Sequence, residues 1–354
     1  MPSYHDDRLQ SLRGLAALIV IIGHGLIVVP QPLFMFLLGG IFQQDAAVVF
    51  FYVLSGFVLG QSLSRDPCFY SFVVRRLARL LPVLWASLAV AIAVSMIVAG
   101  PPIDGATDWY NVYRSVDTSP HAIIMNVFGL SWRINSVMWS VQIELFVIPL
   151  LPLGLLAIQR FVPRQTLIVL IGLCIAGALL LNHDDARPVA YLYCFYIGML
   201  IPNAATTRIL RPFFTPTMVL VGLGITFELY EIGLYPPAKH IVDALVSAQL
   251  LTYVLCSPTA ATFLRHPWLV LMGDVSYSLY AFGQIILIFI AFTMFTVLPA
   301  NSWTDHPMAF AVCLIGLNIV LALLIAAASY RWIELPGMAL AKLILNRRAA
   351  PVTT

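Results

Sequence analysis

The sequence predicts an all-α integral membrane protein, a polytopic bundle of about ten transmembrane helices with both termini in the cytoplasm. Two observations support this class: 61% of the 354 residues are hydrophobic while only 10% are charged, and the mean hydropathy is +0.93. Soluble globular proteins carry about 25% charged residues. The composition therefore excludes a soluble globule, and a net charge of +3 without basic runs argues against a nucleic-acid partner.

Ten apolar segments approach the length of about 20 residues that crosses a hydrocarbon core. They lie near residues 12–30, 46–63, 77–99, 138–158, 165–181, 188–204, 213–229, 241–262, 274–298 and 308–332. Several contain Pro or Gly, which membrane helices tolerate where neighbouring groups satisfy the freed backbone. The longest connection runs from about 100 to 137. Because no repeat or soluble appendage interrupts the pattern, we expect a single domain over residues 1–354.

The orientation follows from the preference of Lys and Arg for cytoplasmic loops. With a cytoplasmic N-terminus, fifteen of the 19 basic residues fall in the tails and the even-numbered loops. The outer side keeps only Arg114, Arg133, Arg187 and Lys239. This asymmetry favours both the ten-helix division and the cytoplasmic termini.

The first apolar segment, LRGLAALIVIIGHGLIVV, carries Arg13 and His24 with only apolar residues and glycine between them. Eleven helical steps of about 100° and 1.5 Å place both side chains on one face, about 16 Å apart along the axis. An ionisable group inside a bilayer is costly. The pair therefore predicts a functional site, with an arginine near one membrane surface and a buried histidine below it.

A second cluster, VRRLARLLP at 74–82, begins the third apolar segment. Arg76 and Arg79 are three residues apart and share a helical face, while Arg75 points away. Two guanidinium groups at a membrane surface suit phosphate, whose oxygens arginine binds in a bidentate way. The alternative is that these arginines set the topology or contact anionic lipid heads.

A third cluster, NSVMWSVQIELF at 135–146, begins the fourth apolar segment. Trp139 and Gln142 share one helical face, and Ser140 and Glu144 share another. Glu144 is either a structural hydrogen-bonding residue or, beside a buried histidine, a candidate orienter or proton acceptor.

Six segments in order resemble acyltransferase family 3, polytopic membrane enzymes that acylate sugars and polysaccharides. They are SLRGLAALIVIIGHG (11–25), VVFFYVLSGFVLG (48–60), RRLARLLP (75–82), WSVQIELF (139–146), GDVSYSLYAF (273–282) and YRWIELPG (330–337). The resemblance covers nearly the whole chain. It implies an acyltransferase of the bacterial cytoplasmic membrane, with acyl-CoA bound by Arg13, Arg76 and Arg79 and proton transfer by His24.

The SYSLY block departs from the family pattern, in which a histidine usually follows three residues on. This chain has Gly283 and then Gln284. We expect Tyr277 and Tyr280 to form interhelical hydrogen bonds first and to contact substrate second. Glu334 is expected to pair with a cytoplasmic arginine rather than to act as a catalyst.

The expected reaction uses acyl-CoA as co-substrate, with acetyl as the expected acyl group, and neither a permanently bound cofactor nor a metal. The pantetheine arm, similar in length to the offset between Arg13 and His24, would bring the thioester beside the imidazole. Burial keeps that imidazole neutral, so it can accept a proton from a hydroxyl of a glycan or another acceptor arriving from the outer side. Candidates for contacting the substrate or stabilising the oxyanion are Trp139, Ser140, Gln142, Asn135, Arg133 and Tyr277.

The competing hypothesis is a secondary transporter in which the intramembrane His24 and Glu144 form a proton relay. Such carriers often consist of two related halves with interrupted helices in matching positions. The sequence shows no such correspondence, which favours the enzyme. Membrane lipid is an expected partner in either case, and no segment indicates an oligomeric state.

Overall fold

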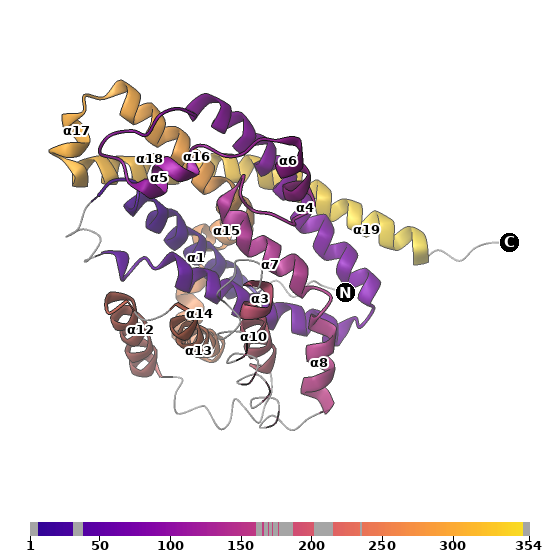
Figure 1. Cartoon of the computed structure of the whole chain (residues 1–354). Helices are drawn as coiled ribbons and strands as arrows, with labels where there is room; N and C mark the ends of the chain where they lie inside the picture. Colours follow the sequence, from indigo (N-terminus) through magenta and orange to yellow (C-terminus); the bar gives the residue numbers. More distant parts are fainter. Residues whose placement is uncertain are drawn as a thin grey trace. The chain divides into compact units, whose positions relative to one another are not determined.

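Helices make up the regular structure of the protein, as the composition predicts. The computed structural model describes residues 6–30, 38–160, 187–201, 215–233 and 236–349, together with positions 165, 169, 172 and 176. Within these residues the regular elements are helices, and no strand occurs (Figure 1). The predicted all-α class is therefore confirmed for the described part of the chain.

The chain forms two compact units, each assembled from three separate stretches. The first unit comprises Met1–Ala16, Gln43–Phe72 and Ile143–Gly273, and the second comprises Ala17–Phe42, Val73–Gln142 and Asp274–Thr354. The chain changes unit within helix α1 (Asp7–Leu26) and again within helix α7 (Trp139–Val147). The units are therefore not successive domains, and the single domain over residues 1–354 stays a prediction.

The first unit packs its helices around α3. Its helices are α3 (Gln44–Arg65), α8 (Leu151–Arg160), α10 (Arg187–Leu200), α12 (Pro216–Glu231), α13 (Pro236–Cys256), α14 (Pro258–Leu264) and α15 (Pro267–Asp274). α3 contacts α8, α10 and α13, and α12 packs on α13. The start of α1 joins this unit because the Arg8 guanidinium donates hydrogen bonds to the carbonyls of Val254 and Leu255 (3.3 and 3.0 Å). A cation at the end of α13 is favourable because the last carbonyls of a helix lack intrahelical donors.

Glycines allow α3 and α10 to approach backbone to backbone. A Cβ added at Gly56 would lie 2.0 Å from the carbonyl oxygen of Phe195, and one added at Gly198 would lie 2.0 Å from that of Val53. Small residues permit this close approach, which membrane helices use in place of a hydrophobic driving force. The VVFFYVLSGFVLG block therefore has a packing role at its glycine.

The second unit is centred on α16. Its helices, besides the later part of α1 and the start of α7, are α4 (Phe69–Val98), α5 (Asp108–Tyr113), α6 (Pro120–Val127), the 3-10 helix η1 (Ser136–Met138), α16 (Ser276–Val297), α17 (Asn301–Thr304), α18 (Pro307–Ser329), the π-helix η4 (Tyr330–Glu334) and α19 (Leu335–Ala349). α16 packs along α18 and is buried over most of its length. Gly283 of α16 lies against Ile21 of α1, and Gly25 of α1 lies against Ile315 of α18. These contacts hold the end of α1 beside α16 and α18.

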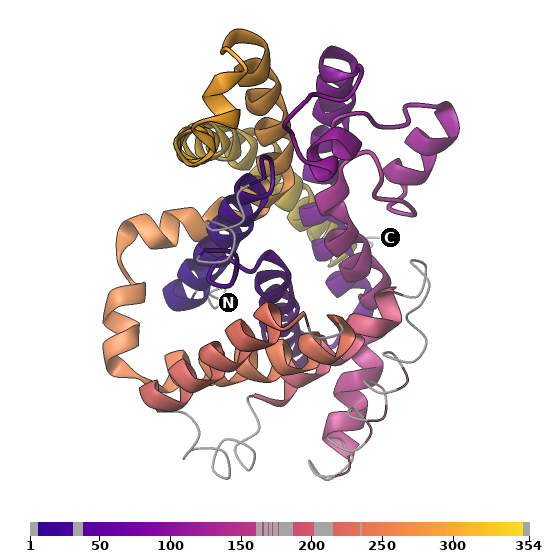
Figure 2. The ribbon, with the colours of Figure 1, turned by 60° about the vertical axis from the view of Figure 1, so that its left-hand side comes forward.

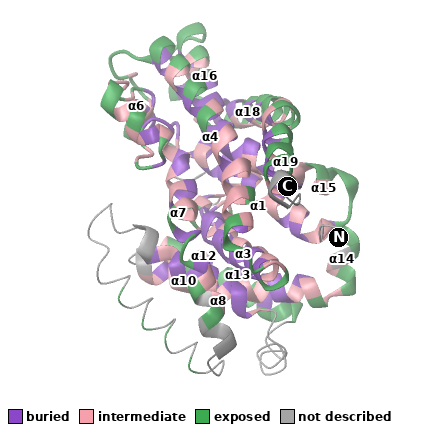
Figure 3. Cartoon of the chain, turned by 90° about the vertical axis from the view of Figure 1, so that its right-hand side faces the viewer, coloured by how far each residue is buried: buried purple, intermediate pink, exposed green. Residues whose placement is uncertain are grey.

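The far side of α18 is apolar and exposed. Val312, Leu317, Val320 and Leu324 are among its exposed side chains, and the exposed faces of α18 and α19 are green in Figure 3. α18, η4 and α19 form one apolar helix over Pro307–Asn346, 40 residues long. At 1.5 Å per residue it measures about 60 Å, roughly twice a hydrocarbon core. The exposed face of α18 therefore suits lipid, while the helix as a whole is longer than one membrane crossing requires.

α4 contains a proline that its neighbour helix accommodates. Pro82 has no N–H, so the carbonyl of Ala78 one turn earlier loses its usual helical donor. A Cβ added at Gly337 of α19 would lie 2.5 Å from that carbonyl oxygen and 3.0 Å from the Pro82 ring. Gly337 therefore allows α19 to pack directly on the site of the missing hydrogen bond.

Five of the ten predicted spans are confirmed as helices long and apolar enough to cross a membrane. They are Asp7–Leu26, Gln44–Arg65, Phe69–Val98, Ser276–Val297 and Pro307–Asn346. A sixth is possible if α13 and α14, which meet at 85° (Figure 2), count as one span. These numbers concern the described residues, and ten spans with cytoplasmic termini stay a prediction.

The other predicted segments differ from the structure or lie outside it. The segment 138–158 was wrong as one helix, because α7 and α8 are separated by a turn at 148–150, where Pro149 and Pro152 remove backbone donors. For 188–204 and 213–229 the structure has α10 and α12, of 14 and 16 residues, shorter than a full crossing. Most of 165–181 lies outside the described residues.

The close approach of α3 and α10 gives a stability prediction. Gly56→Ala should destabilise the protein by about 1–3 kcal/mol, because the new Cβ meets a backbone carbonyl that cannot move aside. The matched control is Gly224→Ala in α12, where nothing lies within 4 Å and the substitution should stabilise by about 0.5–1 kcal/mol. Thermal unfolding of both variants in detergent tests this, and equal midpoints would contradict the packing role of Gly56.

Candidate functional site

His24 lies in the last turn of α1, near the end of the span rather than midway along it. The helix begins at Asp7 and ends at Leu26, a few residues earlier at each end than the apolar segment predicts. The His24 ring is half-buried and stacks on Trp109, with the ring centroids 5.6 Å apart and the planes at 21°. A ring nitrogen is hydrogen-bonded to the backbone carbonyl of Val20, one turn earlier. Since a carbonyl only accepts, that nitrogen carries the proton, and the second nitrogen of a neutral ring is an acceptor.

The connection between α4 and α7 folds back over the end of α1. Thr107 fixes it there, because its Oγ1 donates to the Ile27 carbonyl (2.5 Å) and its N–H donates to the Val28 carbonyl (3.0 Å). The same hydroxyl caps α5 by accepting from the N–H of Tyr110 (3.4 Å), as threonine commonly does. Burial raises the pKa of the Tyr110 phenol, so it stays protonated and donates to the Ile288 carbonyl of α16 (3.4 Å). α5 is thus held against α1 and α16.

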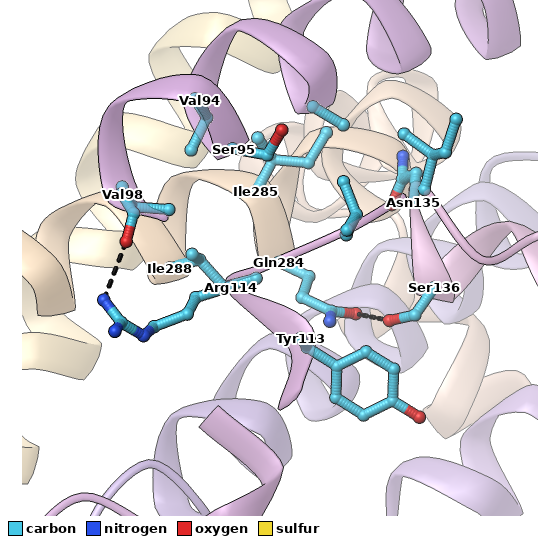
Figure 4. A pocket seen from close by; sticks show the side chains of 13 residues that line it. Val94, Ser95, Val98, Tyr113, Arg114, Asn135, Ser136, Gln284, Ile285 and Ile288 are labelled. Atoms are coloured by element: carbon cyan, nitrogen blue, oxygen red, sulfur yellow. Dashed lines mark hydrogen bonds between the residues drawn. The ribbon is translucent and has the colours of Figure 1, made fainter. Parts of the chain in front are cut away.

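A small cavity of about 20 Å³ lies beside this helix, and Tyr113 of α5 lines it (Figure 4). Its polar lining residues are Ser95, Tyr113, Arg114, Asn135, Ser136 and Gln284. The Tyr113 ring contacts Trp109, with centroids 5.4 Å apart, and Trp109 in turn stacks on His24. Two ring contacts therefore connect the imidazole to the cavity wall.

Asn135 is the best-fixed of the predicted site residues. It is 3% exposed, and its Nδ2 donates to Ser87 Oγ (3.1 Å) and to the Ala281 carbonyl (3.0 Å). Because Ala281 offers only an acceptor, the orientation of the amide is determined. Both N–H groups are committed, so Asn135 does not meet the expectation of an oxyanion donor. Its Oδ1 is buried and has no hydrogen-bond partner among the described residues.

Gln284 and Arg114 complete the polar lining of the cavity. Gln284 is 4% exposed, and its Oε1 accepts from Ser136 Oγ (2.8 Å). Arg114 is 3% exposed, and its guanidinium donates to the carbonyls of Val98 (2.7 Å) and Pro101. Figure 4 shows the Arg114 guanidinium pointing to the Val98 carbonyl and the Gln284 amide pointing the other way, to Ser136.

A separate buried cluster joins α4, α16 and η4. Arg79 Nε lies 3.4 Å from Glu334 Oε1, and the Glu334 side chain is fully buried. Its Oε2 accepts from Ser278 Oγ (3.2 Å), and Ser278 also contacts Ser329 (3.1 Å). The prediction that Glu334 pairs with an arginine is confirmed. Arg79 is therefore partly committed to a structural ion pair.

The expected interhelical roles of the tyrosines are confirmed. Tyr277 donates to the Leu80 carbonyl of α4 (2.8 Å). Ser140 donates to the Tyr280 hydroxyl, which donates to the Val137 carbonyl (2.9 Å each). The Ser140 proton is thus used within the fold, which leaves it a poor oxyanion donor.

The remaining predicted residues are scattered. Trp139 and Gln142 are half-buried, and Gln142 lines a second cavity of about 10 Å³, which Asn135 also lines. Arg133 is exposed. Glu144 is half-buried in the first unit.

The predicted basic cluster is divided between the units. Arg13 is half-buried in the first unit, whereas Arg76 and Arg79 are half-buried in the second. Arg75 is exposed, as its helical phase predicts. Convergence of the three site arginines stays a prediction.

Sequence reasoning missed the residues that the connection contributes. Trp109, Tyr113 and Arg114 lie in a stretch interpreted only as an outer loop, although its aromatic and basic content, WYNVYR, differs from its acidic surroundings. That local composition is the signal that could have singled it out. The sequence marks Gln284 as part of a departure from the family pattern but assigns it no role.

The described helices define an all-helical protein with several apolar spans and a histidine that stacks on a tryptophan at the end of one of them. Comparison with family models matches residues 6–327 to the acyltransferase domain of acyltransferase family 3. The chain therefore belongs to that family, and the predicted resemblance is confirmed. Its apolar helices and this family together indicate a multi-pass membrane acyltransferase. No curated protein and no solved structure matches the chain.

The committed amide of Asn135 gives a second stability prediction. Asn135→Asp should destabilise the protein by about 1–3 kcal/mol, since a carboxylate oxygen cannot donate to the Ala281 carbonyl and leaves it unsatisfied. Asn346→Asp, on the exposed end of α19, is the control and should change little. Chemical unfolding in detergent followed by circular dichroism measures both. A stable Asn135→Asp protein would show that the amide orientation is wrong.

Proposed function

We propose that the protein is an O-acyltransferase that moves an acyl group, acetyl in the first instance, from cytoplasmic acyl-CoA to a hydroxyl of a sugar, polysaccharide or lipid-linked glycan. The observation that carries the proposal is the position of His24. Its ring lies at the end of a span and is fixed by the Val20 carbonyl and by stacking on Trp109. The proposed location is the bacterial cytoplasmic membrane.

The fixed imidazole suits general-base catalysis. A catalytic base is usually oriented by a second group, and the hydrogen bond to Val20 supplies that orientation. In the proposed step the acceptor O–H bond breaks as its proton moves to the second ring nitrogen of His24. The oxygen attacks the thioester carbonyl, the C–S bond breaks, and the leaving thiolate takes up the proton. Glu144 is proposed to orient the imidazole or to accept a proton, but the step above is complete without it.

The donor is proposed to enter from the N-terminal side of α1. Arg13 and His24 lie on one continuous helix, eleven residues or about 16 Å apart along its axis. A pantetheine arm of similar length would connect phosphates near Arg13 to a thioester near His24. Arg76 is the second proposed phosphate ligand, and Arg79 contributes with the part of its side chain that the Glu334 pair leaves exposed.

Fewer residues remain candidates for stabilising the oxyanion than the sequence suggests. The amide hydrogens of Asn135 and the hydroxyl of Ser140 are already donated. The Gln142 amide is a proposed donor, because donors must be available when negative charge develops, and the Trp139 indole stays a candidate on the sequence alone. Tyr277 is proposed to hold α16 on α4 rather than to contact substrate.

The purified protein in detergent with radiolabelled acetyl-CoA and a mixture of soluble glycosides provides the direct test. Acceptor-dependent release of thiol, with label appearing in the glycoside, supports the enzyme. If no condition releases thiol and an intact solute shows counterflow in proteoliposomes, the result would instead support a transporter.

Replacement of the base gives the first functional prediction. His24→Ala should lower kcat by about 10²–10⁴-fold, the usual contribution of a positioned base, while leaving insertion and yield unchanged. His121→Ala is the control, because His121 is exposed on α6 of the same unit. If His24→Ala retains most of the activity, His24 is not the base.

Neighbouring arginines allow a matched test of donor binding. Arg76→Gln should raise the KM for acetyl-CoA by about 10- to 100-fold, since hydrogen bonds to charged groups contribute about 1.5–3 kcal/mol. Arg75→Gln, exposed on the other face of α4, should leave that KM within about two-fold, as surface charges contribute little. Equal effects of the two substitutions would contradict a specific phosphate site.

A further inference from the structure

The connection between α4 and α7 returns to a level well inside two apolar spans. Asn135 donates to Ser87 Oγ of α4 and to the Ala281 carbonyl of α16. Ser87 lies eleven residues before α4 ends at Val98. Ala281 lies sixteen residues before α16 ends at Val297. At 1.5 Å per residue these separations are about 16 and 24 Å along the helix axes. Asn135 therefore lies far from the ends of both spans.

Two further contacts agree with this level. Tyr277 donates to the Leu80 carbonyl, and it lies before Ala281 in α16 as Leu80 lies before Ser87 in α4. The two helices therefore run in the same direction, and their last residues lie on the same side. Trp85 of α4 donates its indole N–H to the Val127 carbonyl, the last of α6 (2.9 Å). α6 thus ends beside the middle of α4 rather than beyond its end.

The polarity of this segment is opposite to that of a loop in water. Its apolar face consists of Ile124, Phe128 and Leu130, which are 55%, 70% and 49% exposed. Asn126 and Asn135, in contrast, are 5% and 3% exposed and line a cavity of about 10 Å³ together with residues of α4. Neighbouring apolar side chains that are this exposed mark a surface that contacts a membrane or another protein.

The backbone of the segment is satisfied without water. The N–H groups of residues 128–131 all donate to carbonyls of α6. Asn126 continues this pattern, because its Nδ2 donates to the Ala122 carbonyl (2.8 Å) and its Oδ1 accepts from the N–H of Ile134 (3.4 Å). Irregular backbone inside a membrane requires such internal partners, since lipid offers none. The hydrogen bonds of these residues therefore meet the condition for a position within the membrane.

We propose that residues 120–138 form a re-entrant membrane segment whose apolar face is covered by lipid acyl chains. Lipid is favoured over a protein partner because the face continues onto a membrane span, where Trp85 is 47% exposed beside the end of α6. Arg133, the only Asp, Glu, Lys or Arg within residues 120–138, is exposed. It is compatible with lipid contact, since long arginine side chains extend from apolar surroundings to the polar headgroups.

Nitroxide labels test the proposal, because their collisions with oxygen report lipid and their collisions with a water-soluble nickel chelate report water. The five native cysteines are replaced by alanine. Phe128→Cys, Leu130→Cys and Ser115→Cys are then each labelled in the full-length protein in liposomes. Labels at the first two positions should collide mainly with oxygen. Ser115 is the aqueous control, because it is exposed and its neighbour Arg114 bonds to the Val98 carbonyl at the end of α4. Its label should collide mainly with nickel.

The other two patterns would overturn the proposal. Nickel collisions at Phe128 and Leu130 equal to those at Ser115 would show that the segment is a loop in water. Few collisions with either reagent at Phe128 and Leu130 would show that protein covers the apolar face.

A substitution tests lipid contact without labels. Phe128→Asp should lower the yield of folded protein from membranes at least several-fold, because a carboxylate in contact with acyl chains is costly. Val112→Asp is the matched control, since Val112 of α5 is similarly exposed (63%) but α5 is held at the end of α1. Its yield should stay close to that of the wild-type protein. Equal yields of the two variants would contradict the proposal.

Discussion

The second unit depends on the requirement that polar groups in an apolar interior satisfy one another. Water is not present there to replace a lost partner, so each pair fixes the helices that supply it. Along α16 the Ala281 carbonyl receives the Asn135 amide, Tyr280 meets Ser140, and Tyr277 reaches the Leu80 carbonyl. These bonds tie α4, α16 and the start of α7 together. The bond to Ala281 also fixes Asn135, which lines a small cavity together with Gln284.

Some buried polar atoms of this unit have no hydrogen-bond partner among the described residues. Asn135 Oδ1 and Glu334 Oε1 are two of them, although Arg79 Nε lies 3.4 Å from Glu334 Oε1. Asn135 lines one small cavity together with Arg114 and Gln284. Ser140, a plausible catalytic residue in the sequence, instead uses its hydroxyl within the fold.

The sequence predicts what depends on local pattern and general membrane physics. Hydropathy identifies α1, α4, α16 and α18, and helical phase distinguishes Arg75 from Arg76. Glu334 could be assigned an arginine partner because a buried carboxylate requires one. The break after α7 was missed since prolines such as Pro149 also occur inside membrane helices. The stacking of His24 on Trp109 joins segments far apart in the chain, and no local signal encodes such a contact.

The proposed acyl-transfer site combines a fixed imidazole with the activity of the acyltransferase family. Its most direct test is an experimental structure of the protein bound to an acetyl-CoA analogue in which a ketone replaces the thioester. The proposal predicts that the ketone carbon lies within a few ångströms of the second ring nitrogen of His24, since reacting atoms must approach to about 3–3.5 Å. A ketone bound elsewhere, with His24 facing only protein or lipid, would contradict it.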